Sequence, residues 1–378
     1  MIRVMVIDDS ALVRRIASDI LSADPEITVV ATAAQAEFAL LKLEKEKPDV
    51  ITLDLEMPGM GGLEAIRRIM ATRPTPIVVL SAHARKGAEL TLQALDLGAV
   101  DFALKPSASL SGGLTAIATE LVEKVKDASR IVFPPPAAPP AAGPAAFGPA
   151  ISGTSAPVAP HTLKAPARPI RPRLEYAGET ECELVAIGTS TGGPVALKTV
   201  LSMLPGSLPV GLVVVQHMPP VFTKAFADRL NDSCEISVKE AENGDAIIPG
   251  RVLLAPGNWH MTVSKFGTEP RVALDQSENV NGHRPSVDVL MHSVALEYGS
   301  RAVGVIMTGM GRDGAEGLRE LHRRGGHVIA QDRESSVIYG MNREVVQNGS
   351  ADEVVPVDRI ADRIVEALRS RAVSRKDL

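Results

Sequence analysis

Three polar residues in the second half of the chain follow apolar, strand-like runs and are of types that cooperate in nucleophilic catalysis. Ser190 lies in the motif GTSTGG, His217 in QHM and Asp313 in TGMGRDG. A serine hydroxyl becomes a good nucleophile when a neutral imidazole takes its proton, and a carboxylate can hold that imidazole in the required tautomer. These residues therefore predict a hydrolase site in which Ser190 attacks, His217 is the base and Asp313 orients it.

The glycine-rich turn around Ser190 admits a second interpretation. Free amides at the start of a helix bind phosphate, so GTSTGG could hold a nucleotide, although no lysine follows as in a P-loop. For a hydrolase, backbone amides near Thr191 and Met310 are candidate oxyanion donors. Two further histidines, His260 and His283, lie in turn-rich stretches suited to lining a cleft.

A second set of polar residues ends the strand-like runs of the first third of the chain. Asp8 and Asp9 follow the first run, Asp54 ends the third, Ser81 the fourth and Lys105 the fifth. Carboxyl ends of parallel strands share one edge of a sheet, and three carboxylates meeting there repel one another unless a cation lies among them. Helix capping alone would explain Asp9 but not the lysine. The pattern predicts a Mg²⁺ site beside groups that can hold a phosphoryl group.

Short apolar runs that alternate with helical patterns must position both sets of residues. In the first third the runs are 3–8, 28–32, 50–54, 77–81 and 101–105. Helical spacing at Ala11–Ser22 and Gly62–Ala71 then makes a five-fold βα repeat.

A second series of runs predicts a mainly parallel sheet in the last half of the chain. These runs are 183–190, 211–217, 251–256, 301–309 and 327–332. Segments 261–266 and 271–276 predict an antiparallel hairpin inserted in this domain. The chain order Ser, His, Asp differs from that of α/β-hydrolases and disfavours that fold.

Composition divides the chain of 378 residues in two, because twelve of its 28 prolines fall between Pro134 and Pro172. Such a stretch cannot bury enough apolar surface to form a core. We predict a flexible linker at 129–178 between domains at 1–128 and 179–372, with a proline-rich ligand for a partner as the alternative.

Charge and hydropathy exclude several classes of protein. The net charge is −5, and from Leu174 onward 21 basic residues face 27 acidic ones, which argues against nucleic acid as a partner. No apolar run approaches the roughly 20 residues of a membrane span, and the first residues form a strand-like run instead of a leader. We expect a cytoplasmic protein without membrane insertion. The two cysteines are 52 positions apart and predict neither a disulfide framework nor a zinc site.

Residues 1–128 resemble two-component receiver domains, which implies a flavodoxin-like (βα)₅ fold. The family's acidic pair matches Asp8 and Asp9, its phosphoacceptor matches Asp54 in DLEMPGMGG, and its hydroxyl and lysine positions match Ser81 and Lys105. The resemblance implies that a histidine kinase phosphorylates Asp54.

The same resemblance assigns further roles in this domain. It implies that Mg²⁺ is held by Asp9, Asp54 and the backbone carbonyl of Glu56, with Asp8 beside them. Phe102 matches the family's aromatic switch position, and the Lys105–Pro106 bond is expected to be cis.

The motifs GTSTGG, QHMP, APGNWHM, NGHRPSVDVL and TGMGRDG occur in the order seen in chemotaxis-type protein-glutamate methylesterases, the CheB-like family. The resemblance implies a doubly wound, Rossmann-like catalytic domain carrying the triad Ser190, His217 and Asp313, with Thr191 in the same site. It implies hydrolysis of glutamyl methyl esters, and deamidation of glutamines, on methyl-accepting chemoreceptors during adaptation. No cofactor is expected for the esterase. The long proline-rich linker departs from the family pattern.

Three other functions are alternatives to the esterase. A DNA-binding response regulator would need a basic surface, a nucleotide-binding enzyme would use GTSTGG as a phosphate cradle, and a non-catalytic adaptor would carry a vestigial triad. For the esterase, we hypothesise that the unphosphorylated receiver covers the Ser190 cleft and that phosphorylation of Asp54 loosens this contact.

Overall fold

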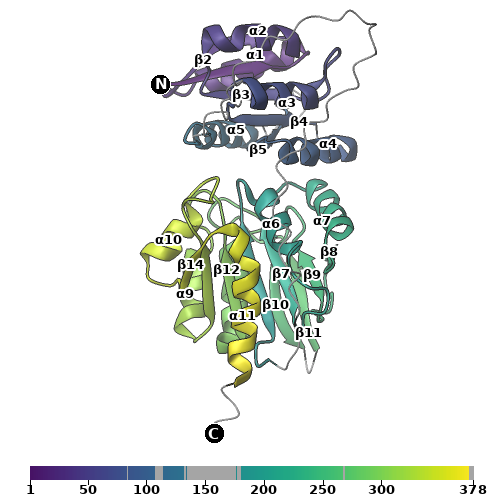
Figure 1. Ribbon diagram of the computed structural model, residues 1–378, viewed down its shortest axis with the longest axis vertical. Helices are drawn as coiled ribbons and strands as arrows, with labels where there is room; N and C mark the ends of the chain where they lie inside the picture. Colours follow the sequence, from purple (N-terminus) through teal and green to yellow (C-terminus); the bar gives the residue numbers. More distant parts are fainter. Residues whose placement is uncertain are drawn as a thin grey trace, which may run out of the picture.

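The computed structural model describes residues 1–82, 84–106, 114–131, 133, 176, 180–266 and 269–373. Most of the predicted linker at 129–178 lies outside these residues, so the linker and the domain boundaries stay predictions. The described residues form two α/β domains, one above the other in Figure 1.

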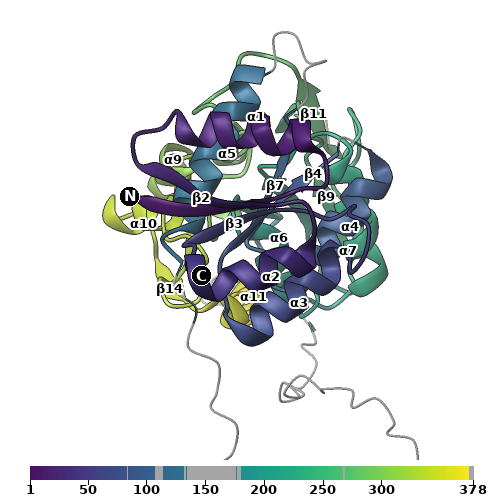
Figure 2. The same cartoon turned by 90° about the horizontal axis from the view of Figure 1, so that it is seen from above.

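The N-terminal domain is a parallel sheet of five strands in the order β2-β1-β3-β4-β5. Its elements are β1 (Ile2–Ile7), α1 (Ala11–Ser22), β2 (Ile27–Ala33), α2 (Ala36–Glu46), β3 (Val50–Asp54), α3 (Gly62–Thr72), β4 (Ile77–Ser81), α4 (Arg85–Asp96), β5 (Asp101–Leu104) and α5 (Leu114–Ala128). Figure 2 shows α1 and α5 on one face of the sheet and α2, α3 and α4 on the other. Every residue of β3 and β4 is buried, as expected of strands covered on both faces. The predicted (βα)₅ domain is confirmed.

The C-terminal domain has a parallel sheet of seven strands in the order β14-β13-β12-β6-β7-β9-β8. Its first elements are β6 (Leu184–Thr189), α6 (Gly193–Leu201), β7 (Gly211–Gln216), α7 (Phe222–Ser233), β8 (Ser237–Glu240), β9 (Arg251–Leu254), β10 (His260–Phe266) and β11 (Glu269–Asp275). The others are α8 (Val287–Glu297), η1 (Gly299–Arg301), β12 (Ala302–Ile306), α9 (Ala315–Arg323), β13 (His327–Gln331), α10 (Met341–Gln347), β14 (Glu353–Val355), η2 (Val357–Arg359) and α11 (Ile360–Val373).

Sequence patterns predicted the five inner strands of this sheet and the hairpin, β10 paired antiparallel with β11. The two edge strands were missed. β8 has four residues and β14 has three, and both are partly exposed, so neither carries the apolar run that marks an inner strand.

Close packing brings the start of α8 to the centre of this sheet. A Cβ atom at Gly188, in β6, would overlap the side chain of Val287 at the first turn of α8. Gly188 therefore lets the helix approach the strand that precedes Ser190.

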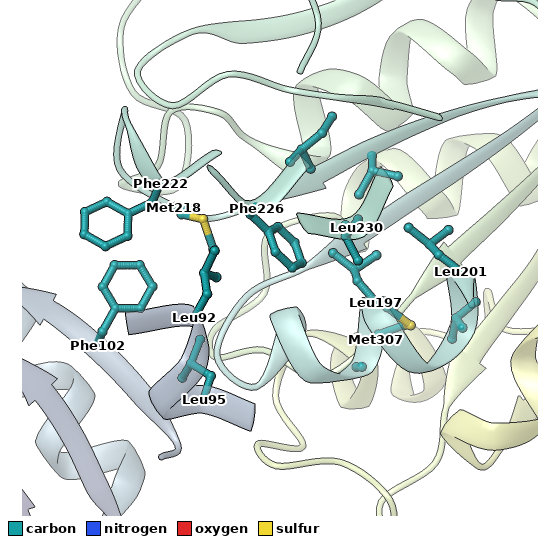
Figure 3. Close-up of a cluster of buried hydrophobic side chains, with 14 of the residues drawn as sticks. Leu92, Leu95, Phe102, Leu197, Leu201, Met218, Phe222, Phe226, Leu230 and Met307 are labelled. Atoms are coloured by element: carbon teal, nitrogen blue, oxygen red, sulfur yellow. The ribbon is translucent and has the colours of Figure 1, made fainter. Parts of the chain in front are cut away.

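The two domains share one hydrophobic cluster. Figure 3 shows Phe102 and Leu92 of the N-terminal domain close to Phe222, Met218 and Phe226 of the C-terminal domain. The rings of Phe102 and Phe222 stack with centroids 4.5 Å apart and an interplanar angle of 21°. The edge strand β5 and helix α4 of the N-terminal domain are thus packed against the second domain.

Two expectations about the whole chain concern its backbone and its helices. Among the described residues the cis peptide bond is Arg284–Pro285, so the expectation of a cis bond at Lys105–Pro106 was wrong. An X–Pro bond prefers trans by about 0.5–1 kcal/mol, and a family pattern does not by itself override that preference. None of the helices in the described ranges combines the length and apolar character needed to cross a bilayer.

Candidate active site and acidic pocket

Ser190, His217 and Asp313 come together at the carboxyl edge of the seven-stranded sheet. Ser190 follows β6, His217 follows β7 and Asp313 lies in the loop after β12, and these strands are neighbours. Ser190 Oγ lies 3.1 Å from His217 Nδ1, and His217 Nε2 lies 2.8 Å from Asp313 Oδ2. The structure therefore brings the three predicted residues into one hydrogen-bonded chain.

The orientation of the His217 ring decides its tautomer. An ionised carboxylate only accepts hydrogen bonds, so Nε2 carries the proton toward Asp313 and Nδ1 presents its lone pair to the Ser190 hydroxyl. Serine proteases use the opposite ring nitrogen for each partner. Either nitrogen of imidazole can accept a proton, so the inverted ring is competent as a base.

Asp313 is buried and accepts several hydrogen bonds from the start of α8 and the loop before it. The donors are Asn281 Nδ2 at 2.9 Å, Ser286 Oγ at 2.7 Å, Val287 N at 2.6 Å and Asp288 N at 3.2 Å. Burial raises the pKa of Asp313, but the hydrogen bonds from His217, Asn281 and Ser286 outweigh it and hold the pKa well below its ordinary value. Asp313 therefore stays ionised at neutral pH.

A tight turn at 280–283 delivers two side chains to this site. Val280 and His283 exchange backbone hydrogen bonds, while Asn281 and Gly282 have φ of 53° and 83°. This left-handed pair is the Asn-Gly signature of a type I′ turn. It places the Asn281 amide on Asp313 and stacks the His283 ring on His217, with centroids 3.8 Å apart and 14° between planes.

Burial, followed by the neighbouring His217, lowers the pKa of His283 to about 3. His283 is therefore a neutral ring against the base. His260 has a different place. Its Nδ1 accepts from Ser286 N at 3.2 Å and its Nε2 lies 3.0 Å from the Glu278 carbonyl, so it supports the loop that holds Asp313.

The predicted oxyanion donors lie on two loops beside the nucleophile. The Ser190 amide donates to Thr308 O at 3.0 Å, and a Cβ at Gly309 would lie 2.8 Å from Ser190 Cβ, so the loop before Met310 packs against Ser190. Within the described residues, the amides of Thr191 and Met310 donate no hydrogen bond to protein. Both amides are free to bind an anion.

Sequence reasoning missed three residues that support Asp313. Asn281, Ser286 and Asp288 all lie in NGHRPSVDVL, which carried a family resemblance but no assigned chemistry. Asp288 is buried, which raises its pKa, and it accepts from Asn281 and from the Gly317 amide. The signal in the sequence was a hydroxyl, an amide and a carboxylate within eight residues, which together could have indicated a polar network.

The acidic pocket of the N-terminal domain forms as predicted. Asp8, Asp9 and Asp54 each offer an oxygen within 4.8 Å of the others. Asp8 and Asp54 are buried, and apart from the Lys105 ammonium their Oδ2 atoms have no partner among the described residues. Unpartnered buried carboxylate oxygens in a group of three fit a hard cation such as Mg²⁺.

Lys105 balances part of this charge. Its Nζ lies 2.7 Å from Asp54 Oδ2 and 3.2 Å from Asp8 Oδ2. Burial lowers the pKa of Lys105, but its two carboxylate partners outweigh burial and leave the pKa raised. Burial raises the pKa of Asp8, Lys105 lowers it and Asp54 raises it. Burial is the largest of these effects, so the pKa of Asp8 is raised. The Glu56 amide donates to Asp54 Oδ1 at 3.0 Å, and its side chain lies toward Lys86.

The predicted switch residues connect this pocket to the domain interface. Ser81 Oγ accepts a 2.8 Å hydrogen bond from Thr91 Oγ1, on the same helix as Leu92. Phe102 is buried against Phe222 of the other domain.

One carboxylate of the N-terminal domain reaches the residue next to the nucleophile. Asp101 Oδ2 accepts from Thr191 Oγ1 at 2.7 Å, while Asp101 Oδ1 lies 3.3 Å from Lys124 Nζ. Burial lowers the pKa of Lys124, but Asp101 and Glu120 outweigh it and raise the pKa, so Lys124 remains a cation. The N-terminal domain therefore contacts the active site at Thr191.

Comparisons with known proteins match both halves of the chain. Residues 185–364 match the family model described as CheB methylesterase, and residues 4–111 match the response regulator receiver domain. Over 367 residues the chain is 47% identical to a protein-glutamate methylesterase/protein-glutamine glutaminase of Symbiobacterium thermophilum, covering 97% of each chain. It is 44% identical to the protein of the same name from Syntrophotalea carbinolica, covering 98% of this chain and 99% of that protein.

Among solved structures, the CheB methylesterase catalytic domain of Thermotoga maritima is similar. It is 42% identical, with a TM-score of 0.48, and the match covers 49% of this chain and 98% of that domain.

Proposed function

Because this chain belongs to the family of protein-glutamate methylesterases/protein-glutamine glutaminases, we propose that it hydrolyses glutamyl methyl esters, and deamidates glutamines, on protein substrates. The observation that carries the proposal is the chain of hydrogen bonds from Ser190 through His217 to Asp313. We propose the cytoplasmic parts of methyl-accepting chemoreceptors as substrates and a chemotaxis histidine kinase as phosphodonor. Adaptation in chemotaxis is the process that this reaction serves.

The triad geometry supports an acyl-transfer mechanism. Ser190 Oγ attacks the ester carbonyl while its proton passes to His217 Nδ1, 3.1 Å away. The amides of Thr191 and Met310 bind the oxyanion, and Asp313 stabilises the imidazolium through its bond to Nε2. Collapse breaks the C–O bond, and methoxide leaves as methanol with the proton from Nδ1.

The second half of the reaction regenerates the serine. His217 takes a proton from water, the resulting hydroxide attacks the acyl-enzyme carbonyl, and Ser190 Oγ leaves with that proton. The product is a glutamate carboxylate. For a glutamine substrate the same steps release ammonia instead of methanol.

The acidic pocket supports phosphorylation of Asp54. Asp8, Asp9, Asp54 and the carbonyl of Glu56 are the groups that would hold Mg²⁺, which neutralises negative charge on the phosphoryl group when bound. The Lys105 ammonium lies 2.7 Å from Asp54 Oδ2 and is placed to pair with a phosphoryl oxygen.

The contacts between the domains support regulation by phosphorylation. In the unphosphorylated chain Asp101 binds Thr191, and Phe102 packs on Phe222. A phosphoryl group on Asp54 draws the Ser81 hydroxyl toward it and breaks the Ser81–Thr91 bond. Loss of this bond releases α4 and the cover over the active site.

Methanol release from membranes that carry radiolabelled methylated chemoreceptors tests the proposed function. Wild type and Ser190→Ala are compared with and without acetyl phosphate and Mg²⁺. We expect release by wild type to rise with acetyl phosphate and to fall by at least about 10³-fold in Ser190→Ala, because the nucleophile is lost.

Asp54→Asn serves as the control for activation. It should keep the basal rate and lose the response to acetyl phosphate. Absence of release from wild type under every condition would contradict the esterase, and a phosphorylatable adaptor would then be the better explanation.

A further inference from the structure

Gln216, the last residue of β7, is a buried side chain to which the mechanism above gives no part. Its Nε2 donates to the carbonyl of Ser190 at 2.9 Å and to the carbonyl of His217 at 3.0 Å. One amide group thus holds the backbone of the nucleophile and the backbone of the base.

The bond to the Ser190 carbonyl acts on the peptide group that carries a candidate oxyanion donor. The carbonyl of Ser190 and the N–H of Thr191 belong to the same planar peptide unit. The Ser190 carbonyl accepts from Gln216 Nε2 and from Gly193 N, at 2.9 and 2.8 Å. Two donors on this oxygen orient the peptide plane and polarise it, which strengthens the opposite N–H as a donor.

The hydrogen bonds of the Gln216 side chain are all made by its NH₂ group, and its oxygen makes none among the described residues. The NH₂ group therefore sets the orientation of the amide. Gln216 Oε1 is buried and has no hydrogen-bond partner among the described residues. A Cβ atom at Gly193 would overlap Gln216 Oε1 and come within 2.6 Å of Thr189 Oγ1. Gly193, the last glycine of GTSTGG, therefore makes room for this amide. An unsatisfied buried oxygen is costly, and here it accompanies two good bonds to the catalytic loops.

We propose that Gln216 is a positioning residue for the hydrolase. It holds Ser190 against His217 and aims the Thr191 amide at the oxyanion. This inference rests on the proposed esterase mechanism, but it concerns the reactivity of Ser190 and not the identity of the substrate. A readout that needs no receptor can therefore test it.

The test compares Gln216→Met in the full-length chain with a matched variant, Asn342→Leu. Asn342 is also a buried amide with an unpartnered oxygen, and its Nδ2 donates to Gln331 O at 2.9 Å and Ser336 Oγ at 2.7 Å. Neither of these hydrogen bonds goes to Ser190 or His217. Both variants remove two hydrogen bonds from one buried amide, so both should lower the melting temperature to a similar degree.

The first readout is the rate at which an alkyl fluorophosphonate labels Ser190. In this reaction Ser190 Oγ bonds to phosphorus, the P–F bond breaks, fluoride leaves, and His217 takes the hydroxyl proton. The negative phosphoryl oxygen needs the same oxyanion donors. We expect labelling to slow by about 10- to 100-fold in Gln216→Met and by less than about threefold in Asn342→Leu. Methanol release should show the same loss in kcat with KM within about twofold.

Gln216→Glu adds a second measurement, the pH dependence of labelling. This dependence would not change if Gln216 only stabilised the fold. A glutamate here would face two carbonyl oxygens, and burial raises the pKa of such a group. Its protonated form can donate one hydrogen bond, whereas its ionised form repels both carbonyls. The labelling rate of this variant relative to wild type should therefore rise as pH falls from 8 to 5.

Two results would overturn the inference. One is a folded Gln216→Met protein that labels within twofold of wild type. The other is an equal loss of labelling in Gln216→Met and Asn342→Leu, with a ratio for Gln216→Glu that does not change with pH. If wild type labels but releases no methanol, the proposed substrate fails while the labelling still decides the role of Gln216.

Discussion

His283 serves the active site through its ring and not through a charge. Burial and the nearby His217 lower its pKa to about 3, so it stays neutral while His217 gains a proton. The centroid distance of 3.8 Å leaves no room for water between the two rings. A neutral aromatic face can lie against an imidazolium, whereas a second cation would repel it.

Substitutions at His283 separate stacking from titration. His283→Phe keeps an aromatic face and should retain kcat within about fivefold, whereas His283→Ala frees the His217 ring to rotate and should cost about 10- to 100-fold. Methanol release at saturating substrate measures both. Because His283 does not titrate above about pH 4, wild type and His283→Phe should share one pH profile from 5 to 9. A shifted acidic limb in His283→Phe would contradict this role.

Helix α5 carries a buried acid near the domain interface. Asp127 is 1% exposed, and burial raises its pKa to about 7 even though Arg130 lies 3.4 Å away and opposes this rise. The ordinary value of an aspartate is 3.8, so between about pH 4 and 7 the native state keeps a proton that the unfolded state has lost. The free energy of unfolding therefore falls as pH rises through this window.

Asp127→Asn removes this cost. At pH 8 the variant should exceed wild type in free energy of unfolding by about 2–4 kcal/mol, and the difference should vanish near pH 4. Urea unfolding of the full chain at pH 5 and pH 8 measures it. Glu123→Gln is the control: Glu123 is exposed and is one of the smaller causes of the raised pKa of Asp127, so its removal should give a much smaller gain at pH 8 than Asp127→Asn. A gain for Asp127→Asn that is equal at both pH values would show that burial of the charge is not its cause.

Elements also show what the sequence could and could not predict. Strands such as β3 and β4 are mostly apolar and fully buried, so their ends, and with them Asp54 and Ser81, were located from the pattern. Ser190 and His217 were located in the same way. Asn281 and Ser286 were not, because their roles depend on how a loop folds against Asp313, about 30 positions further along the chain. Local periodicity carries no information about such contacts.

At the scale of the whole molecule, a few polar contacts accompany the apolar interface between the domains. Asp96 is the last residue of α4, and the carboxyl end of a helix disfavours negative charge. Lys198 Nζ, in the other domain, lies 3.0 Å from Asp96 Oδ1. Arg229 pairs with the same carboxylate. These side chains are roughly one-third exposed. Each pair is therefore worth at most about 1 kcal/mol. These two ion pairs therefore contribute only a small part of the free energy that holds the domains together.

Removing Asp96 should therefore release part of the basal inhibition. Asp96→Asn breaks both ion pairs and should raise methanol release without acetyl phosphate by about 2- to 10-fold, since 1.4 kcal/mol corresponds to a factor of ten in an equilibrium. Release with saturating acetyl phosphate and Mg²⁺ should match wild type, because the activated state no longer uses this contact.

Asp228→Asn is the matched control, because Asp228 pairs with Lys224 within α7 and does not reach the other domain. Added salt should raise the basal rate of wild type toward that of Asp96→Asn. A basal rate that is equal in wild type and Asp96→Asn at low salt would mean that the apolar contact of Phe102 with Phe222 holds the domains together without help from these charges.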